Sequence, residues 1–322
     1  MSYKKNFFIF SVAVLVFFAA AEIAARVLTS FFMVYDVEMA EYALRLQQSS
    51  ENPFIGHVHK PGISPTRLMG VTLRTNSDGL RGPEYAVEKG AAYRIVLLGD
   101  SLTLGWGVDE NKTFASSLEK KLNTRRKTEV LNFGVGNYNS EQEVNLFFER
   151  AVKYHPDEVV LFYFINDAEK TPHRSGFWFL AYSRFLTLVW SRGHALGALF
   201  SPSGKFLSYY ANLYKENQEG WLRAQRALLR ISRYCREQNI SFRVVILPEF
   251  HNLAENPFKK EYGKVESLLD KNRIPYLDLA SAFERYRDPY QFWVAPDDAH
   301  PNAKAHQLIA DSIYDWKVGQ LR

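Results

Sequence analysis

The chain has 322 residues, which allows one large domain or two small ones. Its content of 47% hydrophobic and 23% charged residues excludes both a disordered chain and a membrane protein with many spans. The net charge of +5 comes from scattered Lys and Arg residues, which favours solvated helix faces over a nucleic-acid partner, and the single cysteine, Cys235, excludes an internal disulfide.

The N-terminal segment, residues 1–35, is strongly apolar. Two lysines precede an uncharged run from residue 7 to residue 21, and Glu22 and Arg26 follow at a spacing that lets them pair on one helical face. Because apolar residues persist beyond this pair, we expect an uncleaved single-pass anchor. It would hold the rest of the chain on the extracytoplasmic, periplasmic side of the cell membrane.

Two other interpretations of residues 1–35 stay open. The small residues Ala19 to Ala21 fit the cleavage site of a signal peptide, which would also export the body of the chain. A buried helix of a soluble protein is the third interpretation. No cysteine lies near position 20, so a lipoprotein anchor is excluded.

Residues 36–92 hold turn signals and few periodic segments. A short strand is expected at 71–75, directly before the turn sequence Asn76-Ser77-Asp78-Gly79. We interpret the region as a linker and an N-terminal extension that packs on the main domain.

Strands and helices alternate from residue 93 onward. Strands are expected at 94–98, 129–133, 158–164, 242–247 and 274–277, and helices at 113–122, 140–154, 221–238, 257–271 and 303–318. This alternation predicts a three-layer α/β/α domain over residues 93–322, in which about five parallel strands adopt a flavodoxin-like order.

An aromatic-rich insertion, residues 168–215, interrupts this alternation. We interpret it as a helical cap with a small core of its own. A lid or acceptor platform over a ligand site, or a surface that contacts the bilayer, are the alternatives, because insertions at the carboxyl ends of parallel strands border such sites.

The strongest candidate for a reactive side chain is Ser101, which follows the first strand within the sequence Gly99-Asp100-Ser101-Leu102. A serine needs a neighbouring base to act as a nucleophile. His300, before the last helix, can supply that base, and Asp297, three residues earlier, can orient it through a turn. Taken alone, Ser101 would be interpreted as the N-cap of the next helix rather than as a nucleophile.

Donors for a negatively charged oxygen are expected after the second and third strands. Gly134 to Asn137 form a Gly-rich turn whose backbone N–H groups can approach a ligand closely, and Asn166 carries a side-chain amide. Taken alone, Asn166 would be interpreted as a turn residue or a helix cap rather than as a donor. The serine, the turn, the asparagine and the histidine all fall at strand ends or in the last loop, which indicates one active site.

Over residues 93–318 this pattern resembles the SGNH (GDSL) hydrolase family. Gly99 to Leu102 matches the first block of that family, Gly134 to Asn137 the second, Asn166-Asp167 the third and Asp297-x-x-His300 the last. An upstream segment, from residue 75 to residue 82, resembles a segment of the single-span membrane-anchored members.

The resemblance implies a role for each matching residue. Ser101 would be the nucleophile, His300 the general base and acid, and Asp297 the residue that orients His300. The oxyanion hole would be built from three donors: the N–H of Ser101, an N–H at Gly136 or Asn137, and the Asn166 amide.

Two positions depart from the family pattern. Phe164 stands where the third block has glycine, and Asn137 stands where the second block has its oxyanion glycine. Phe164 and His251, which follows the fourth strand, are candidates for substrate contact, with ordinary loop structure as the alternative for His251. No metal-ligand spacing and no phosphate-binding loop is present, so no cofactor is expected.

We therefore expect hydrolysis or transfer of an acyl ester through an acyl-Ser101 intermediate, with water or a sugar hydroxyl as acceptor. By analogy with the family, the substrate class is O-acetylated polysaccharide, and lipid ester is the rival. A hypothesis of another class is a catalytically silent scaffold that binds glycan or partners within an envelope assembly.

Overall fold

The computed structural model describes residues 2–171, 182–199 and 205–319. The chain divides into two compact units, and it passes between them three times. The helical unit consists of Met1–Leu46 and Arg174–Ser203, and the sheet unit consists of Gln47–His173 and Gly204–Arg322.

The aromatic-rich insertion contributes to both units. Its helix α6 (Arg184–Leu199) belongs to the helical unit, whereas α7 (Lys205–Leu213) belongs to the sheet unit. Phe177, Trp178, Phe179 and Phe200 of the insertion lie outside the described residues.

Five parallel strands form the central sheet of the sheet unit, as predicted. They are β5 (Tyr93–Gly99), β6 (Thr128–Gly134), β7 (Glu158–Tyr163), β8 (Ser241–Ile246) and β9 (Tyr276–Asp278). Their order is β6-β5-β7-β8-β9, which is the flavodoxin-like order. The order reverses between β5 and β7, so a crevice is expected at the carboxyl ends of these two strands.

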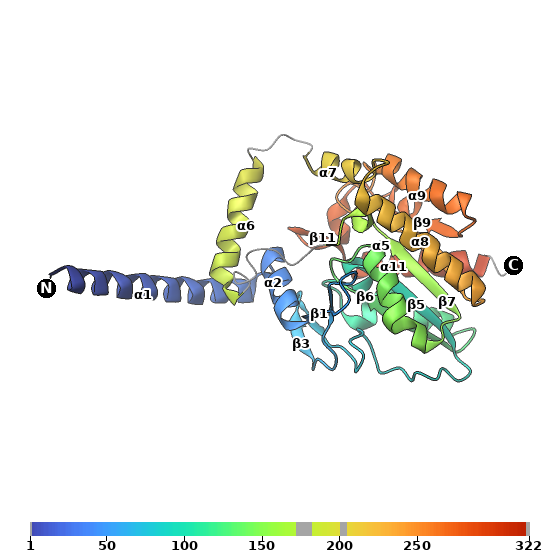
Figure 1. Cartoon of the computed structure of the whole chain (residues 1–322), viewed down its shortest axis with the longest axis horizontal. Helices are drawn as coiled ribbons and strands as arrows, with labels where there is room; N and C mark the ends of the chain where they lie inside the picture. Colours follow the sequence, from blue (N-terminus) through green and yellow to red (C-terminus); the bar gives the residue numbers. More distant parts are fainter. Residues whose placement is uncertain (1, 172–181, 200–204, 320–322) are drawn as a thin grey trace. The chain divides into compact units, whose positions relative to one another are not determined.

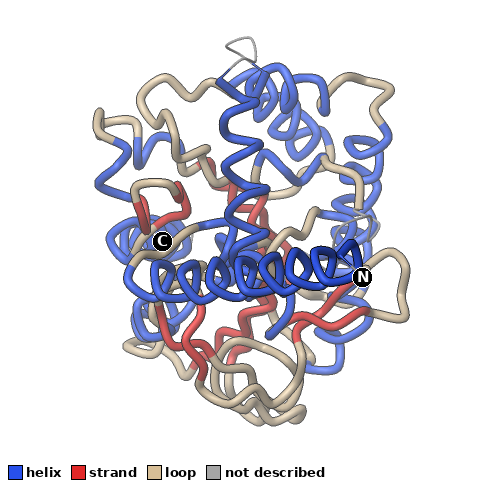
Figure 2. The backbone as a smooth tube through the Cα atoms, turned by 90° about the vertical axis from the view of Figure 1, so that its left-hand side faces the viewer, coloured by secondary structure: helices blue, strands red, loops and turns tan. Residues whose placement is uncertain are grey.

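Helices cover both faces of this sheet because the strand side chains alternate between two apolar cores. Val96 and Leu98 of β5 point into one core, and Ile95 and Leu97 point into the other. The first core is closed by α5 (Ser140–Leu146), α8 (Glu219–Glu237) and α9 (Lys259–Lys271), and the second by α4 (Phe114–Leu122) and α11 (Ala303–Gly319). Figure 1 shows α5 and α8 beside the strands, and Figure 2 traces the same elements as tubes.

Several short elements differ from the prediction. The helix expected over 140–154 is α-helical only to Leu146 and then continues as a π turn, Phe147–Ala151, and a 3-10 turn, Val152–Tyr154. The strand expected at 71–75 is shorter, β4 (Val71–Leu73), and pairs with β3 (Thr66–Leu68).

Residues 47–92 of the N-terminal extension belong to the sheet unit, and the buried Arg81 joins them to the segment that follows β5. Arg81 donates to the carbonyl oxygens of Leu104 at 2.9 Å and Gly105 at 2.6 Å, and also to that of Val108. These carbonyls lie at and after the end of α3 (Ser101–Leu104), where helix carbonyls lack intrahelical partners. Arg81 of the extension therefore caps the C-terminus of α3, the helix that begins with Ser101.

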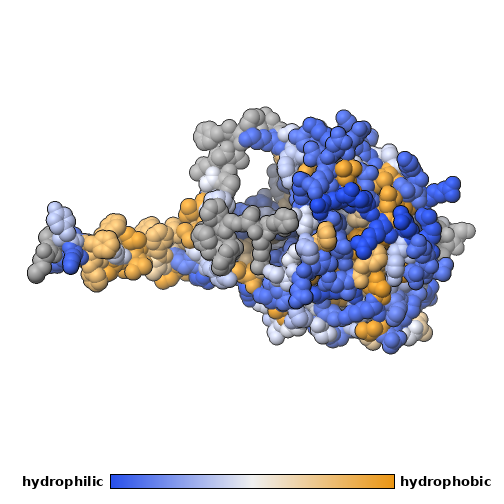
Figure 3. All heavy atoms as spheres, in the orientation of Figure 1, coloured by the Kyte–Doolittle hydropathy of each residue, from blue (hydrophilic) through white to orange (hydrophobic). Residues whose placement is uncertain are grey.

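In the helical unit, α1 (Ser2–Phe31) is apolar along most of its length. Residues 3–31 have a mean hydropathy of 2.5 in their most apolar window, and their side chains are largely exposed, as the orange surface in Figure 3 shows. Length and composition make α1 the one helix among the described residues that can cross a membrane. It is followed by α2 (Tyr35–Arg45).

Helix α6 is bound to α1 through Glu22. The Glu22 carboxylate accepts hydrogen bonds from Ser183 Oγ at 2.7 Å and from the backbone N–H of Phe185 at 3.1 Å, and it pairs with Arg26 at 2.7 Å. The first turn of a helix has unsatisfied N–H groups, so a carboxylate there is stabilising. The charge inside the apolar segment thus serves as a cap for a second helix.

Candidate active site

Ser101 and His300 lie in direct contact at the carboxyl end of β5. The Oγ atom of Ser101 is 2.8 Å from Nε2 of His300, although 199 positions separate the two residues in the sequence. Asp100 is the N-cap of α3 and accepts from the N–H of Leu102, which leaves Ser101 as the first residue of the helix rather than its cap. The helix N-terminus thus presents the serine at the edge of the sheet.

The carboxylate that contacts His300 belongs to Asp298, not to Asp297. Nδ1 of His300 donates to Oδ1 of Asp298 at 2.5 Å, which leaves Nε2 as the acceptor for the Ser101 hydroxyl. The physical reason is local structure: residues 298–301 form a strand, β11 (Asp298–Pro301), not a turn. Side chains at i and i+2 of a strand share a face, so Asp298 lies beside His300, whereas Asp297 precedes the strand and is exposed.

Trp106 supports both members of this pair. Its indole Nε1 donates to Oδ2 of Asp298 at 2.7 Å, and its ring stacks on that of His300 with centroids 5.3 Å apart. Trp106 is 1% exposed. The two oxygens of Asp298 therefore each accept a hydrogen bond, and the imidazole plane is fixed by the indole.

The charge of Asp298 is stabilised in this setting. Burial by itself raises the pKa of a carboxyl group, but the hydrogen bonds from His300 and Trp106 outweigh it, so the pKa of Asp298 lies below its ordinary value. An ionised Asp298 holds the proton on Nδ1 of His300 and stabilises the imidazolium that forms when Nε2 takes a proton.

Asn166 lies next to this centre and is oriented by Asp100. Its side-chain Nδ2 donates to Oδ2 of Asp100 at 3.0 Å, which uses one of the two amide protons and leaves the other available. Asn166 Oδ1 is buried and accepts no hydrogen bond from any described residue. Since β5 and β7 are neighbours, Asp100 and Asn166 meet across the point where the strand order reverses.

The Gly-rich turn after β6 packs on α3. A Cβ atom at Gly134 would lie 2.2 Å from Leu104 N, so only glycine permits this approach. Gly136 is buried, and Asn137 is exposed with a φ of 65°, a left-handed conformation that glycine adopts freely and that asparagine tolerates better than most other residues. The replacement of glycine by asparagine at position 137 thus keeps the backbone shape.

Two further carboxyl groups are buried near Asn166. Asp167 accepts from the N–H of Phe164 at 2.6 Å and from Ser140 Oγ at 2.8 Å, whereas neither oxygen of Glu143 has a partner among the described residues. Burial, together with the charge of Asp100, raises the pKa of both Asp167 and Glu143 well above the ordinary range.

The two candidates for substrate contact occupy different settings. Phe164 is half-buried between the two apolar cores. His251 is 54% exposed, its Nδ1 pairs with Glu249, and its ring meets that of Trp293 at 5.1 Å. The hydrogen bond with Glu249 raises the pKa of His251. Because Trp293 pairs with Pro301 in β11, this group borders His300, whereas Phe164 has a packing role.

Asp298, Trp106 and Asp100 are site residues that the sequence analysis did not assign. Asp298 sits next to the predicted aspartate, and the alternation of a short strand would have selected it. Trp106 stands between two glycines just after the serine helix, which is the only local signal for it. Among the described residues, no group of three or more His, Cys, Asp or Glu side chains is arranged to hold a metal ion.

Solved structures similar to this chain include a G-D-S-L lipolytic protein from Desulfitobacterium hafniense, which is 14% identical with a TM-score of 0.44 and covers 69% of this chain and 97% of its own. The LAE5 hydrolase from a Lake Arreo metagenome is 17% identical with a TM-score of 0.49, and the match covers 72% of this chain and 97% of the LAE5 chain. The acetylxylan esterase Axe2 of Geobacillus stearothermophilus is 14% identical with a TM-score of 0.47, and the match covers 71% of this chain and 95% of the Axe2 chain. No curated protein sequence matches the chain.

Residues 97–308 match the GDSL-like lipase/acylhydrolase family. The match begins at residue 97, near the end of β5, and contains Ser101, the Gly-rich turn, Asn166 and His300, so it covers the whole hydrogen-bonded centre described above. The chain belongs to the GDSL-like lipase/acylhydrolase family, a family of acyl-ester hydrolases.

Proposed function

We propose that the protein cleaves acyl esters through a covalent acyl-Ser101 intermediate. The Ser101 oxygen attacks the ester carbonyl while its proton passes to Nε2 of His300, and the protonated His300 then gives that proton to the departing alkoxide. A second hydroxyl compound, either water or a sugar alcohol, attacks the acyl-serine and loses its proton to His300, which gives that proton to the Ser101 oxygen as the bond between it and the acyl group breaks.

One observation carries this proposal: the unbroken chain of hydrogen bonds from Ser101 through His300 to Asp298. A solvated serine and an isolated histidine do not need such geometry, and the buried Asp298 would be costly without it. The Asn166 amide supplies a donor for the negative oxygen of the tetrahedral intermediate. The position of His300, 2.8 Å from the Ser101 hydroxyl, supports a catalytic function over a catalytically silent scaffold.

We further propose that α1 anchors the protein in a membrane, with the sheet unit on the extracytoplasmic side. The exposed apolar surface of α1 and the two lysines before it support this arrangement. A cut after Ala21 would leave Glu22 with α6, but it would remove Phe17 and Phe18, whose rings contact that of Phe185 at centroid distances of 6.3 and 6.1 Å. The α1–α6 contact therefore favours an uncleaved anchor.

For the substrate, we propose O-acetylated polysaccharide. Two aromatic side chains lie near His300. Trp293 is half-buried and pairs with Pro301, and its ring centroid is 4.5 Å from that of Tyr290, which is 65% exposed. Aromatic rings with a polar neighbour such as His251 suit the apolar faces and hydroxyl edges of sugars. A lipid ester is the second candidate, favoured by the proximity to a bilayer that α1 would impose.

The reaction type is tested by reacting full-length protein in detergent micelles with a fluorophosphonate probe and with p-nitrophenyl acetate. Ser101→Ala is expected to abolish labelling and to lower kcat/KM by at least about 10³-fold. Ser117→Ala, which removes a serine of the same 9% exposure on α4, is the matched control and should change neither. Equal turnover by Ser101→Ala and wild type would refute a serine mechanism.

The substrate class is tested by measuring acetate release from acetylated xylan and mannan beside fatty-acid release from lipid esters. Trp293→Ala is expected to raise KM for acetylated polysaccharide several-fold and to leave KM for p-nitrophenyl acetate within about twofold, because the small ester does not reach Trp293. Faster turnover of lipid esters, with no response to Trp293→Ala, would instead assign the protein to the lipid esterases.

A further inference from the structure

The N-terminal extension reaches the Gly-rich turn through its strand β2 (His57–His59), which pairs with β1 (Gln47–Ser49). Nε2 of Gln142 donates to the carbonyl oxygen of Ile55 at 2.7 Å, and the Tyr138 hydroxyl donates to the carbonyl oxygen of His57. The rings of His57 and Tyr138 also meet edge to face, with centroids 5.1 Å apart. Because Tyr138 and Gln142 are buried, they hold His57 in a fixed position.

The imidazole of His57 contacts the backbone of that turn. Its Nε2 lies 3.0 Å from the carbonyl oxygen of Gly136. A carbonyl oxygen only accepts hydrogen bonds, so Nε2 carries a proton and donates it. His57 of the extension thus forms a hydrogen bond with the peptide group of Gly136, in the Gly-rich turn beside the active site.

The peptide group between Gly136 and Asn137 can take either of two opposite orientations without opening the turn. The N–H of Tyr138 donates to the carbonyl oxygen of Val135 at 3.3 Å and closes a β-turn, in which Asn137 has a φ of 65° and Gly136 does not have a positive φ. That is the type II pattern. Types I and II share the closing hydrogen bond and differ by a flip of the central peptide, which here joins Gly136 to Asn137.

The hydrogen bond from His57 selects one of these two orientations. In a planar trans peptide the N–H points opposite to the C=O, and the described chain has no cis peptide. With the Gly136 oxygen held by His57, the Asn137 N–H must therefore point away from His57. A flip to type I would break the bond to His57 and reverse the N–H.

The Asn137 N–H is free to meet a ligand. Among the described residues it donates to no acceptor, whereas the preceding Val135 N–H donates to the carbonyl oxygen of Gly99, two residues before Ser101. The contact between Gly134 and Leu104 N brings the same turn against the serine helix. An oxygen bound at Ser101 thus lies next to the turn that carries this donor.

We infer that His57 is a positioning residue that locks the Gly136–Asn137 peptide so that the Asn137 N–H serves as an oxyanion donor. The inference rests on the proposed acyl-transfer function and deepens it, because it selects Asn137 over Gly136 as the second-block donor. It also gives the N-terminal extension a part in the chemistry: the segment preorganises the site without touching substrate.

The test compares His57→Ala, His57→Phe and His57→Gln in full-length protein in detergent, with p-nitrophenyl acetate as substrate. His57→Phe keeps a ring against Tyr138 but removes the donor, so it stays informative if His57→Ala does not fold. Loss of one oxyanion donor lowers kcat by about 10²–10³-fold, and a misoriented donor is expected to lower it by about 10–100-fold with KM within about twofold. His57→Gln, whose amide nitrogen can reach the same carbonyl, is expected to recover most of the lost kcat.

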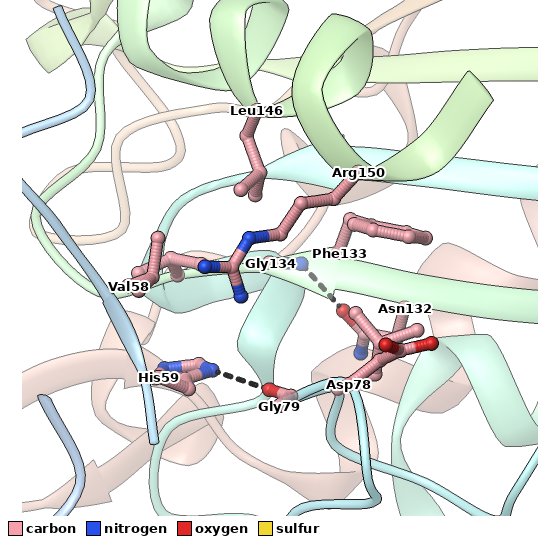
Figure 4. A pocket seen from close by; sticks show the side chains of 11 residues that line it. Val58, His59, Asp78, Gly79, Asn132, Phe133, Gly134, Leu146 and Arg150 are labelled. Atoms are coloured by element: carbon pink, nitrogen blue, oxygen red, sulfur yellow. Dashed lines mark hydrogen bonds between the residues drawn. The ribbon is translucent and has the colours of Figure 1, made fainter. Parts of the chain in front are cut away.

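His59→Ala is the matched control, because His59 lies on the same strand and its Nδ1 bonds the carbonyl oxygen of Gly79 at 3.2 Å. Figure 4 shows this bond at a small cavity that is lined also by Arg150 and Asn132. The control should lower the thermal midpoint and leave kcat unchanged. A purely structural role for His57 predicts instead that both histidine variants behave alike.

A second readout uses phenylboronic acid, whose tetrahedral adduct with serine places an oxygen in the oxyanion hole. For the His57 variants, Ki should rise by the same factor by which kcat/KM falls. Wild-type protein without Ser101-dependent turnover would overturn the proposed function itself. Ser101-dependent turnover that His57→Phe leaves intact, with Ki unchanged, would overturn the role of His57 alone.

Discussion

Trp106 donates a hydrogen bond to the second carboxylate oxygen of Asp298, and its indole ring stacks on the imidazole of His300. We predict that Trp106→Phe lowers kcat about tenfold, because a hydrogen bond to a charged group contributes about 1.5–3 kcal/mol while the remaining ring still stacks on His300. Trp316→Phe, on α11, is the control and should leave kcat unchanged. A kcat within twofold of wild type for Trp106→Phe would mean that the indole N–H has no part in holding Asp298.

The two neighbouring aspartates can be told apart by one pair of variants. Asp298→Asn is expected to lower kcat by about 10³–10⁴-fold, because the amide favours the wrong tautomer of His300. Asp297→Asn, at an exposed position with the same change of charge, should stay within about twofold. The pair is measured by p-nitrophenyl acetate turnover, and the opposite ranking would return the orienting role to Asp297.

The difference between these residues shows where sequence reasoning stops. Ser101 and Asn166 follow long strands and His300 precedes a long helix, so the sequence could propose all three, and the structure brings Ser101 and His300 into contact. Asp298 depended on a four-residue strand, and strands of that length carry too little periodicity to set a register. Trp106 and His57 act through contacts with residues 192 and 79 positions away, which no local pattern encodes.

At the scale of elements, the π turn at the end of α5 and the buried Glu143 distinguish this helix from the others. We predict that Glu143→Gln stabilises the protein, and that the gain in free energy of unfolding grows from pH 5 to pH 8. Burial raises the pKa of Glu143 in the folded state, followed by repulsion from Asp167 and Asp100. The folded state therefore binds a proton that the unfolded state releases, and stability falls as pH rises above the ordinary pKa of 4.5.

Chemical denaturation at both pH values checks this prediction, with Glu141→Gln as the control. Glu141 lies on the same helix and forms an ion pair with Arg223 at 2.9 Å, so its replacement should lower stability. A gain for Glu143→Gln that is the same at pH 5 and pH 8 would show that Glu143 does not hold a proton in the folded protein.

The main elements of the sheet were predictable, whereas β4 was the only strand of the extension that the sequence predicted. Each long strand is an apolar run bounded by turn residues, and the alternation with helices sets the parallel order. The strands of the extension and β10 (Trp293–Ala295) have three residues each, and they pair as β1 with β2, β3 with β4 and β10 with β11. Apart from β4, strands of this length carry too little periodicity to be recognised from local sequence.

At the scale of the whole molecule, the helical unit joins two segments that are distant in sequence. Arg184 of α6 pairs with Glu41 at 3.1 Å and donates to Thr29 at 2.9 Å, and Phe185 meets the rings of Phe17 and Phe18. We predict that a protein lacking residues 1–46 self-associates, since α6 then exposes an apolar face and an unpaired arginine. Size-exclusion chromatography in detergent-free buffer measures this directly.

The control for that prediction lacks residues 1–46 and also has residues 174–203 replaced by a short Gly-Ser linker. With both halves of the helical unit removed, the remaining sheet unit should elute as a monomer. A monomeric protein with α6 still in place would show that α6 does not depend on α1.

The chain crosses between the two units three times, and these crossings affect how proteolysis could release the sheet unit from the proposed anchor. An enzyme held by a simple N-terminal stalk is released by one proteolytic cut. Here a cut after Leu46 would leave α6 covalently joined to the sheet unit on both of its sides, and still bound to α1 through the Glu22 carboxylate. With α1 as the proposed membrane anchor, a nicked protein would stay attached to the membrane, and the proposed activity would stay local to the cell that made it.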